Sequence, residues 1–250
     1  MLYAVLGIIQ GLTEFLPVSS SGHLALFSLI FNIRESQVLP IIIICHIGTL
    51  FAVFSFFARD IWRILKDLVI LGQIFVVTLI TLIFALIGKN FFERLFREPV
   101  FICLALFITA VFLLSTRGIK KGRRDLFALN FRDAFWLGIS QGFAIIPGIS
   151  RSGITIFSLL ARGMAPEVAF KFSFIAGIPA ILGSFFWEAK NIALVFNHHP
   201  LDFWLTLIIS YIVGLFSLLI LRRVVKKLQL HYFGYYLVLI SILGFILTRT

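Results

Sequence analysis

The sequence predicts an all-α polytopic membrane protein with six transmembrane helices and two re-entrant helical hairpins, arranged as an inverted-topology repeat. Composition is the first reason: the 250 residues are 60% hydrophobic and 13% charged, whereas soluble domains carry about 25% charged residues. The second reason is that two apolar stretches are broken by proline and glycine, and the third is that these two stretches resemble each other. We therefore expect a single integral membrane domain over 1–250.

Six apolar stretches are long enough to cross a bilayer, which takes roughly 20 residues per helix. They are 39–57, 68–88, 100–116, 170–187, 203–221 and 232–248. Two further stretches, 1–30 and 137–161, are interrupted at Pro17-Val-Ser-Ser-Ser-Gly22 and at Pro147-Gly-Ile-Ser-Arg-Ser-Gly153. Backbone freed inside a bilayer must be buried in protein or line a wet cavity. The two breaks therefore mark candidate sites.

The two broken stretches align with each other. Leu6-Gly-Ile-Ile-Gln-Gly11 matches Leu137-Gly-Ile-Ser-Gln-Gly142, and at the same offset two serines and a glycine recur. These residues are Ser19, Ser21 and Gly22 in the first stretch and Ser150, Ser152 and Gly153 in the second. The pattern predicts a duplication, with repeat 1 at about 1–116 and repeat 2 at about 132–250.

The distribution of basic residues predicts how the chain crosses the membrane. Loop 117–132 holds six basic residues and segment 222–227 holds four, so both should face the cytoplasm. Only an even number of crossings between them satisfies this, which requires stretch 137–161 to enter and return. Three spans per half then give the halves opposite orientations, with both termini outside. Because topology accounts for the excess of basic residues, we expect no nucleic acid partner.

Glu14 is a carboxylate within an apolar run, and a charge at the bilayer centre costs on the order of 3 kcal/mol on insertion scales. Gln10 lies four residues earlier, on the same helix face. A carboxylate with an amide oxygen suits a divalent metal, Mg²⁺ or Ca²⁺, shared with substrate phosphates. Glu14 could instead pair structurally with another residue.

The serines and glycine after Pro17 predict an anion site, because free backbone N–H groups at a helix start bind phosphate. Ser19, Ser21 and Gly22 are the candidates there. Ser20 and His23, three residues apart, could form a nucleophile and base. Two alternatives use the same residues: a water activated by Glu14, or His23 itself as the nucleophile. Small residues here could also serve only close helix packing.

Arg151 stands at the second break between Ser150 and Ser152, with Gly153 following. Its planar fork matches two phosphate oxygens at once. A purely structural arginine here would need a buried carboxylate, and Glu14 could supply it. Together the two breaks predict a phosphoryl-transfer site near the midplane, where positioning and charge neutralisation do most of the catalysis.

At these motifs the sequence resembles the undecaprenyl-diphosphate phosphatase family, known also for bacitracin resistance. The resemblance rests on Gln10 to His23, His46-Ile-Gly-Thr49, Pro147 to Thr155, and Phe172-Ser-Phe174. It implies a polytopic enzyme of the bacterial plasma (inner) membrane. Such an enzyme hydrolyses undecaprenyl diphosphate to the monophosphate and so recycles the carrier lipid for cell-wall synthesis.

The resemblance also implies roles for particular residues and a side of access. Glu14, Ser19 to Ser21, His23 and Arg151 fall on the family's functional positions, and the site is expected to open to the periplasm. The family's acidic pair allows glutamine at its first position, which Gln10 occupies here, so a two-carboxylate metal site is not implied.

Two rival functions remain open. Inverted repeats and broken helices also occur in transporters, so a lipid or anion carrier is the alternative, although a carrier does not need the set of Ser20, His23, Arg151 and Glu14. A non-catalytic scaffold would have no use for Glu14 and Arg151 in apolar surroundings. The expected partners are the polyprenyl diphosphate lipid and the bilayer, and a homodimer is left open.

Overall fold

The computed structural model describes residues 2–30, 35–198 and 200–248, and within them every regular element is a helix. The predicted all-α class is therefore confirmed. Residue 1 of the predicted first broken stretch lies outside the described residues. The helices are α1 (Leu2–Thr13), α2 (Ser20–Ile30), α3 (Glu35–Phe56), α4 (Ala58–Ile64), α5 (Leu68–Arg97), α6 (Pro99–Ser115), η1 (Thr116–Gly118), α7 (Phe131–Phe143), α8 (Arg151–Ala161), α9 (Pro166–His198), α10 (Pro200–Lys226) and α11 (His231–Leu247).

Four helical segments among the described residues are long and apolar enough to cross a membrane: Leu68–Gly88, Pro99–Gly118, Pro166–Gly183 and Pro200–Lys226. A fifth candidate joins α3 to α4 across a bend of 74°. These segments overlap five of the predicted spans. The remaining prediction, 232–248, coincides with α11, which has 17 residues. The chain is thus an all-helical, multi-pass membrane protein.

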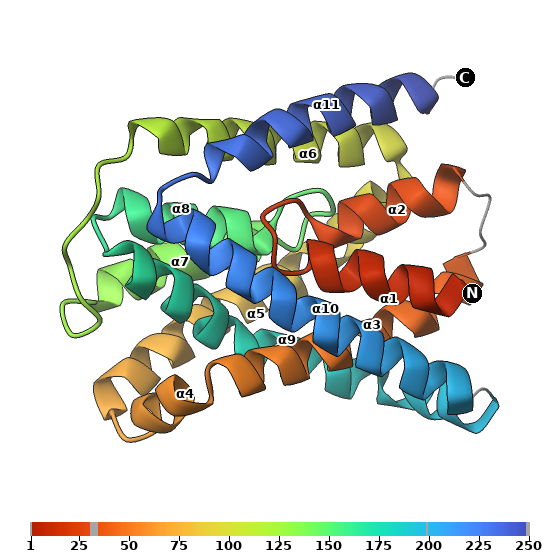
Figure 1. Ribbon diagram of the computed structural model, residues 1–250, viewed down its shortest axis with the longest axis horizontal. Helices are drawn as coiled ribbons and strands as arrows, with labels where there is room; N and C mark the ends of the chain where they lie inside the picture. Colours follow the sequence, from red (N-terminus) through yellow and green to blue (C-terminus); the bar gives the residue numbers. More distant parts are fainter. Residues whose placement is uncertain (1, 31–34, 199, 249–250) are drawn as a thin grey trace.

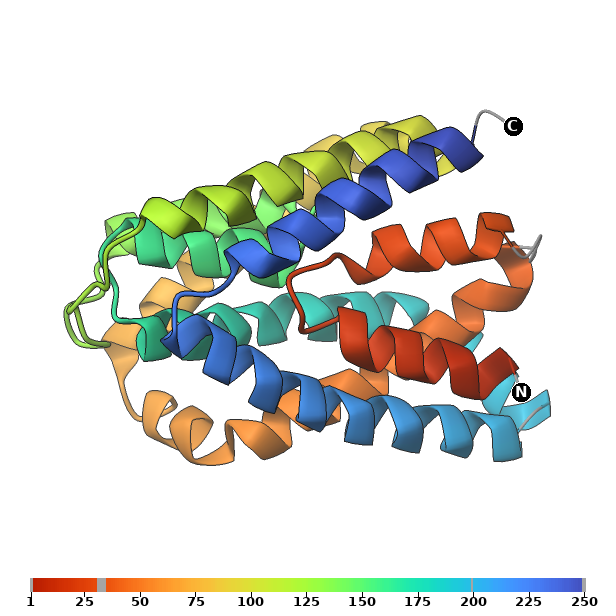
Figure 2. The same cartoon turned by 45° about the horizontal axis from the view of Figure 1, so that its top comes forward.

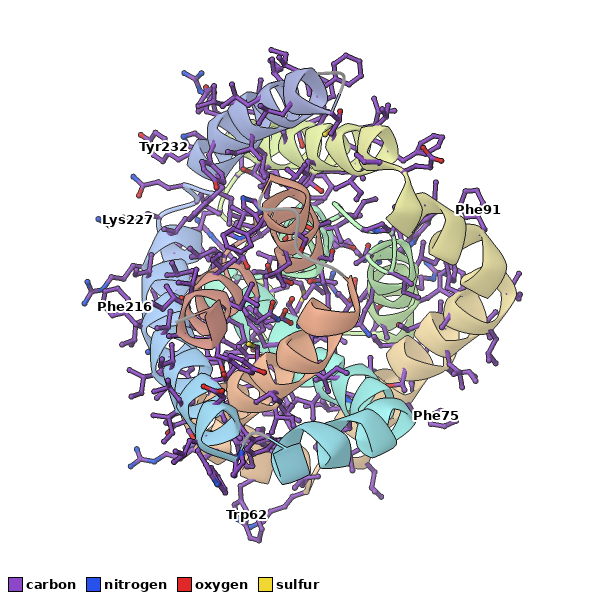
Figure 3. All side chains as sticks on the ribbon, turned by 90° about the vertical axis from the view of Figure 1, so that its right-hand side faces the viewer. Trp62, Phe75, Phe91, Phe216, Lys227 and Tyr232 are labelled. Carbon is purple, nitrogen blue, oxygen red and sulfur yellow. The ribbon has the colours of Figure 1, made fainter. Side chains whose placement is uncertain are left out.

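The outer surface of the molecule is apolar. Trp62, Phe75 and Phe216 expose 64%, 65% and 61% of their area, and Figure 3 shows them at the rim, pointing away from the body. Polar side chains such as Gln10 and Gln141 are instead buried, at 0% and 3% exposure. Water would not favour this pattern, but lipid does, because lipid tails are as apolar as leucine.

The two broken stretches form hairpins that open toward opposite ends of the molecule. Figures 1 and 2 both place the chain termini at one end, and α1 and α2 run from that end to the interior and back. From the opposite end, where loop 119–130 lies, α7 and α8 run inward and return in the same way. The two breaks consequently face each other inside the molecule.

Glycines let each inward-running helix lie close against a long helix. A side chain at Gly11 of α1 would come within 2.8 Å of Val213 on α10, and one at Gly142 of α7 within 2.5 Å of Phe84 on α5. Small residues at such positions let helix backbones approach in lipid, where packing drives association. Because Gly11 and Gly142 occupy equivalent places in the sequence alignment, the two hairpins use the same packing device.

Asp133 anchors the loop between α6 and α7. Its buried carboxylate accepts hydrogen bonds from Arg124 Nη2 at 2.6 Å and from Arg162 Nε at 2.5 Å. Burial alone would raise the pKa of Asp133, but the hydrogen bonds from Arg124, the Asn130 backbone and Arg162 outweigh it and hold that pKa below its ordinary value. The ion pairs thus fix the loop to the start of α7 and the end of α8.

Candidate active site

The two breaks touch each other directly. Ser152 Oγ donates to the carbonyl of Leu16 at 3.4 Å. A side chain at Gly22 would come within 3.2 Å of the Gly148 backbone, and one at Gly153 within 3.3 Å of Pro17. The helix starts of α2 and α8, predicted from separate halves of the sequence, therefore lie together in one interior region.

Ser19 closes the start of α2. Its hydroxyl accepts the Gly22 N–H at 3.3 Å and lies 3.3 Å from the Ser21 hydroxyl. Its backbone has φ of 68°, a left-handed conformation that is uncommon for residues other than glycine and occurs often at functional sites. This conformation helps the chain reverse its direction between α1 and α2, and it places serine hydroxyls at the break.

Ser150 closes the start of α8 in the same way. Its hydroxyl accepts the Gly153 N–H at 3.2 Å and lies 3.3 Å from the Ser152 hydroxyl. Here the positive φ, 96°, falls on Gly148 instead. The serine–serine–glycine pattern noticed in the sequence is thus one local structure formed twice.

Glu14 is the centre of the polar cluster, with 7% of its side chain exposed. Oε1 accepts Arg151 Nη2 at 2.5 Å, while Oε2 accepts Ser20 Oγ at 2.9 Å and Gln10 Nε2 at 2.9 Å. The Gln10 amide nitrogen also donates to His46 Nδ1 at 3.0 Å, and that ring nitrogen lies 3.6 Å from Glu14 Oε2. Three side chains, from α1, α2 and α8, therefore donate hydrogen bonds to one buried carboxylate.

Arg151 carries the positive charge of the cluster and is 20% exposed at its side chain. Its Nη2 donates to Glu14. Its Nη1 lies beside Gly177 of α9, where a Cβ atom added to the glycine would come within 2.9 Å of Nη1. Gln141 Oε1 lies within 4 Å of the same point and is buried without a hydrogen-bond partner. The guanidinium therefore binds a carboxylate through Nη2, while its Nη1 and an unpaired amide oxygen both lie close to Gly177.

His23 does not pair with Ser20. Its Nδ1 lies 2.9 Å from the Ser19 carbonyl and its Nε2 lies 2.7 Å from the Tyr236 hydroxyl. Ser20 Oγ instead donates to Glu14. The arrangement thus favours Glu14 over His23 as the group that receives the Ser20 proton.

The predicted metal ligands Gln10 and Glu14 are in contact, but through the Gln10 nitrogen rather than its oxygen. Gln10 Oε1 is buried without a partner, and rotation of the amide by half a turn would exchange the two atoms. The described residues contain no group of three or more His, Cys, Asp and Glu side chains that could hold a metal ion. The oxygens present fit a hard cation that takes its other ligands from substrate phosphates.

Several residues at the site were not singled out from the sequence. Thr109, buried in α6, donates to the Gly148 carbonyl at 2.9 Å and accepts the Ser150 N–H at 3.1 Å, so it holds the second break in place. His46 was noticed only as part of a motif. Gln141 had a signal, since it matches Gln10 in the repeat, whereas Tyr236 had none because it contacts His23 across 213 positions of sequence.

Comparison with known proteins identifies the family of this chain. The sequence model of the family described as bacitracin resistance protein BacA matches residues 3–243. The chain belongs to the BacA family. The match covers both breaks, so every residue of the polar cluster lies inside the BacA region.

Relatives named undecaprenyl-diphosphatase align over nearly the whole chain. The protein from Alkaliphilus metalliredigens is 39% identical over 257 residues, covering 93% of this chain and 92% of the relative. The protein from Thermosipho africanus is 39% identical, covering 98% and 99%. The protein from Methanococcus vannielii is 35% identical, covering 95% and 96%.

Proposed function

We propose that the chain is an integral membrane phosphatase that hydrolyses undecaprenyl diphosphate to undecaprenyl phosphate and inorganic phosphate. The observation that carries the proposal is the Arg151–Glu14 pair at the meeting point of two broken helices, in a member of the BacA family. An arginine, a carboxylate and a hydroxyl around two helix starts suit transfer of a phosphoryl group. The activity would recycle the carrier lipid in the bacterial plasma membrane.

The proposed membrane arrangement has six crossings and two re-entrant hairpins, α1–α2 and α7–α8, related as an inverted repeat over about 1–116 and 132–250. The equivalent caps at Ser19 and Ser150 and the opposite openings of the two hairpins support it. α11 would be the sixth span, with its 17 residues covering most of the hydrocarbon layer.

The substrate's diphosphate would lie between the two helix starts. The groups proposed to hold it are hydroxyls, one guanidinium and backbone N–H groups of the two helix starts, from Ser19, Ser21, Gly22, Ser150, Arg151, Ser152 and Gly153. The Gly22 and Gly153 N–H groups would exchange the hydroxyls of Ser19 and Ser150 for phosphate oxygens. Arg151 would exchange its contact with Glu14 for phosphate oxygens, since both are anionic oxygen acceptors for the same fork. Substrate binding would thereby release Glu14 to accept a proton.

In the proposed reaction, Ser20 Oγ attacks the terminal phosphorus and its proton passes to Glu14 Oε2, with which it already forms a hydrogen bond. The bond between the terminal phosphorus and the bridging oxygen breaks, and undecaprenyl phosphate leaves. Water then cleaves the phosphoserine, which regenerates the hydroxyl and releases inorganic phosphate. A phosphoserine trapped at Ser20 would support this route, whereas a phosphohistidine trapped at His23 would show that His23 is the nucleophile.

A bound Mg²⁺ or Ca²⁺ would be held by Glu14 and Gln10 and would neutralise phosphate charge. We expect chelation to lower phosphate release, and Glu14→Gln to lose most of the metal-dependent rate because two neutral amides bind a hard cation weakly. Turnover is measured against free metal concentration. A variant with unchanged metal dependence and rate would remove Glu14 from both roles.

The experiment that separates an enzyme from a carrier needs no membrane gradient. Purified protein in detergent micelles is given undecaprenyl diphosphate, and released inorganic phosphate is measured. We expect release from the wild type, loss of release in Arg151→Ala, and normal release in the control Arg123→Ala, whose side chain is exposed in the loop before α7. Wild-type protein that is folded and releases no phosphate would favour the transporter.

A further inference from the structure

The imidazole of His23 is held on both ring nitrogens by groups far apart in the chain. Nδ1 faces the Ser19 carbonyl at 2.9 Å, in the turn before α2. Nε2 faces the Tyr236 hydroxyl at 2.7 Å, on α11. The two rings also stack, with centroids 5.6 Å apart and planes 9° from parallel.

These contacts fix the tautomer of the neutral ring. A backbone carbonyl can only accept a hydrogen bond, so Nδ1 must carry the proton. Nε2 then has a lone pair, which accepts the Tyr236 O–H. The Ser19 carbonyl thus places the proton on Nδ1, while the Tyr236 hydroxyl binds Nε2 and the stacked Tyr236 ring fixes the plane of the imidazole.

Tyr236 differs in this from its neighbours on α11. Tyr232 and Tyr235 expose 60% and 52% of their area, as expected for tyrosines near the surface of a membrane. Tyr236 exposes 42%, yet its hydroxyl is turned to His23. A role confined to the lipid interface would not require this hydrogen bond.

We infer that Tyr236 is a positioning residue for His23, acting through the orientation of that imidazole and the hydrogen bond to its Nε2. The inference rests on the proposed function, in which His23 borders the phosphate-binding turn at Ser19. It links α11, at the end of the second half of the chain, to a site residue of the first half. The site would therefore be incomplete without α11.

Tyr236→Phe tests the inference because it keeps the stacked ring and removes only the hydroxyl. Partners that orient a functional histidine are worth about 10–100-fold at metal sites, and we expect a loss of kcat of about tenfold here, with little change in KM. The control is Tyr235→Phe, which removes a hydroxyl one residue away and should leave kcat unchanged. A Tyr236→Phe enzyme with normal kcat overturns the inference.

A second measurement does not depend on turnover. Protein labelled with ¹⁵N in its histidine rings contains five histidines, and His23→Asn identifies the signals of His23. We expect the wild type to show a protonated Nδ1 and an unprotonated Nε2, and Tyr236→Phe to shift the Nε2 signal because that nitrogen loses its hydrogen bond. Unchanged His23 signals in Tyr236→Phe overturn the inference whatever happens to kcat.

A failure of this inference can be distinguished from a failure of the proposed function. If the wild type releases no phosphate, the proposed function fails while the ¹⁵N signals still report on the pairing. In the His23→Asn background, Tyr236→Phe should lower the residual kcat no further, because the two residues act as a unit. A further tenfold loss there would show that Tyr236 acts without His23.

Discussion

Glu14 illustrates how one buried charge organises its surroundings. A carboxylate out of water is tolerated only when paired and hydrogen-bonded, and Arg151, Ser20 and Gln10 all donate to it. A structural role for the ion pair would produce the same contacts. What distinguishes catalysis is that phosphate can compete for Arg151, so the effect of substitution on rate must exceed its effect on stability.

Arg151→Lys separates these roles. Lysine keeps the charge but meets phosphate oxygens as a point rather than as a fork, and an arginine in phosphoryl transfer can be worth about 10³ in rate. We expect a folded protein whose kcat falls by about 10² or more. Tm and kcat are measured on one purified sample, with Arg123→Lys as the control. A low Tm with normal kcat would assign Arg151 to the fold alone.

Gly177→Ala should disturb Arg151 without disturbing the helix. The added methyl group would lie 2.9 Å from Arg151 Nη1, and the flexible end of that side chain must move. We expect kcat to fall about tenfold while Tm stays close to that of the wild type, since alanine favours helix. Gly183→Ala is the matched control on α9, because no atom lies within 4 Å of its added group. Equal kcat values for both variants would show that Arg151 tolerates the displacement.

At the scale of helices, the two hairpins share a backbone arrangement but carry different functional side chains. Ser19 and Ser150 cap equivalent helices, while at the next position the first half has Ser20 and the second has Arg151. This shared arrangement places two helix starts opposite each other. The residue after each cap then supplies the hydroxyl in one half and the guanidinium in the other.

The stability of the protein should depend on pH through Asp133, whose ion pairs join the start of α7 to the end of α8. Because the pKa of Asp133 is lowered in the folded protein, its ion pairs stabilise the fold above the unfolded pKa of about 4 and lose that effect as pH falls through the folded pKa. Asp133→Asn should therefore lower stability by about 3 kcal/mol at pH 7. Tm from pH 7 to pH 3 should fall less in the variant than in the wild type. If Tm falls equally with pH in the wild type and in Asp133→Asn, Asp133 is not the source of the pH dependence.

At the scale of the whole molecule, several glutamines and serines are buried, while large apolar side chains such as Trp62, Phe75 and Phe216 point outward (Figure 3). The chain termini lie at the end opposite the loop anchored by Asp133 (Figures 1 and 2). Positive charge in that loop would keep it cytoplasmic, and the termini would then be outside.

Single cysteines test this topology, in a protein whose Cys45 and Cys103 are replaced by alanine. Lys121 and Ala161 flank the α7–α8 hairpin and are exposed, and Leu201 is 85% exposed at the start of α10. A membrane-impermeant thiol reagent should label the cysteines at Lys121 and Ala161 from one side and the cysteine at Leu201 from the other. Labelling of Lys121 and Ala161 from opposite sides would replace the re-entrant hairpin by a full crossing.

Much of this protein was determined by the sequence alone. Hydropathy predicted the helical class, because an apolar chain of this length can satisfy its backbone in lipid only within helices or closed barrels. The breaks at Pro17 and Pro147 located the candidate site, because proline and glycine interrupt helices at fixed positions. Glu14 and Arg151 were identified there because a charged side chain in an apolar segment costs free energy of insertion, and such residues are usually functional.

Tertiary structure alone decided how these residues pair. Ser20 and His23 are three positions apart, yet Ser20 contacts Glu14 and His23 contacts Tyr236. Sequence spacing fixes which side chains share a helix face, but not what the facing helix presents. Tyr236, Thr109 and Gly177 reach the site only through packing of α11, α6 and α9, and such long-range contacts leave no periodic trace in a single sequence.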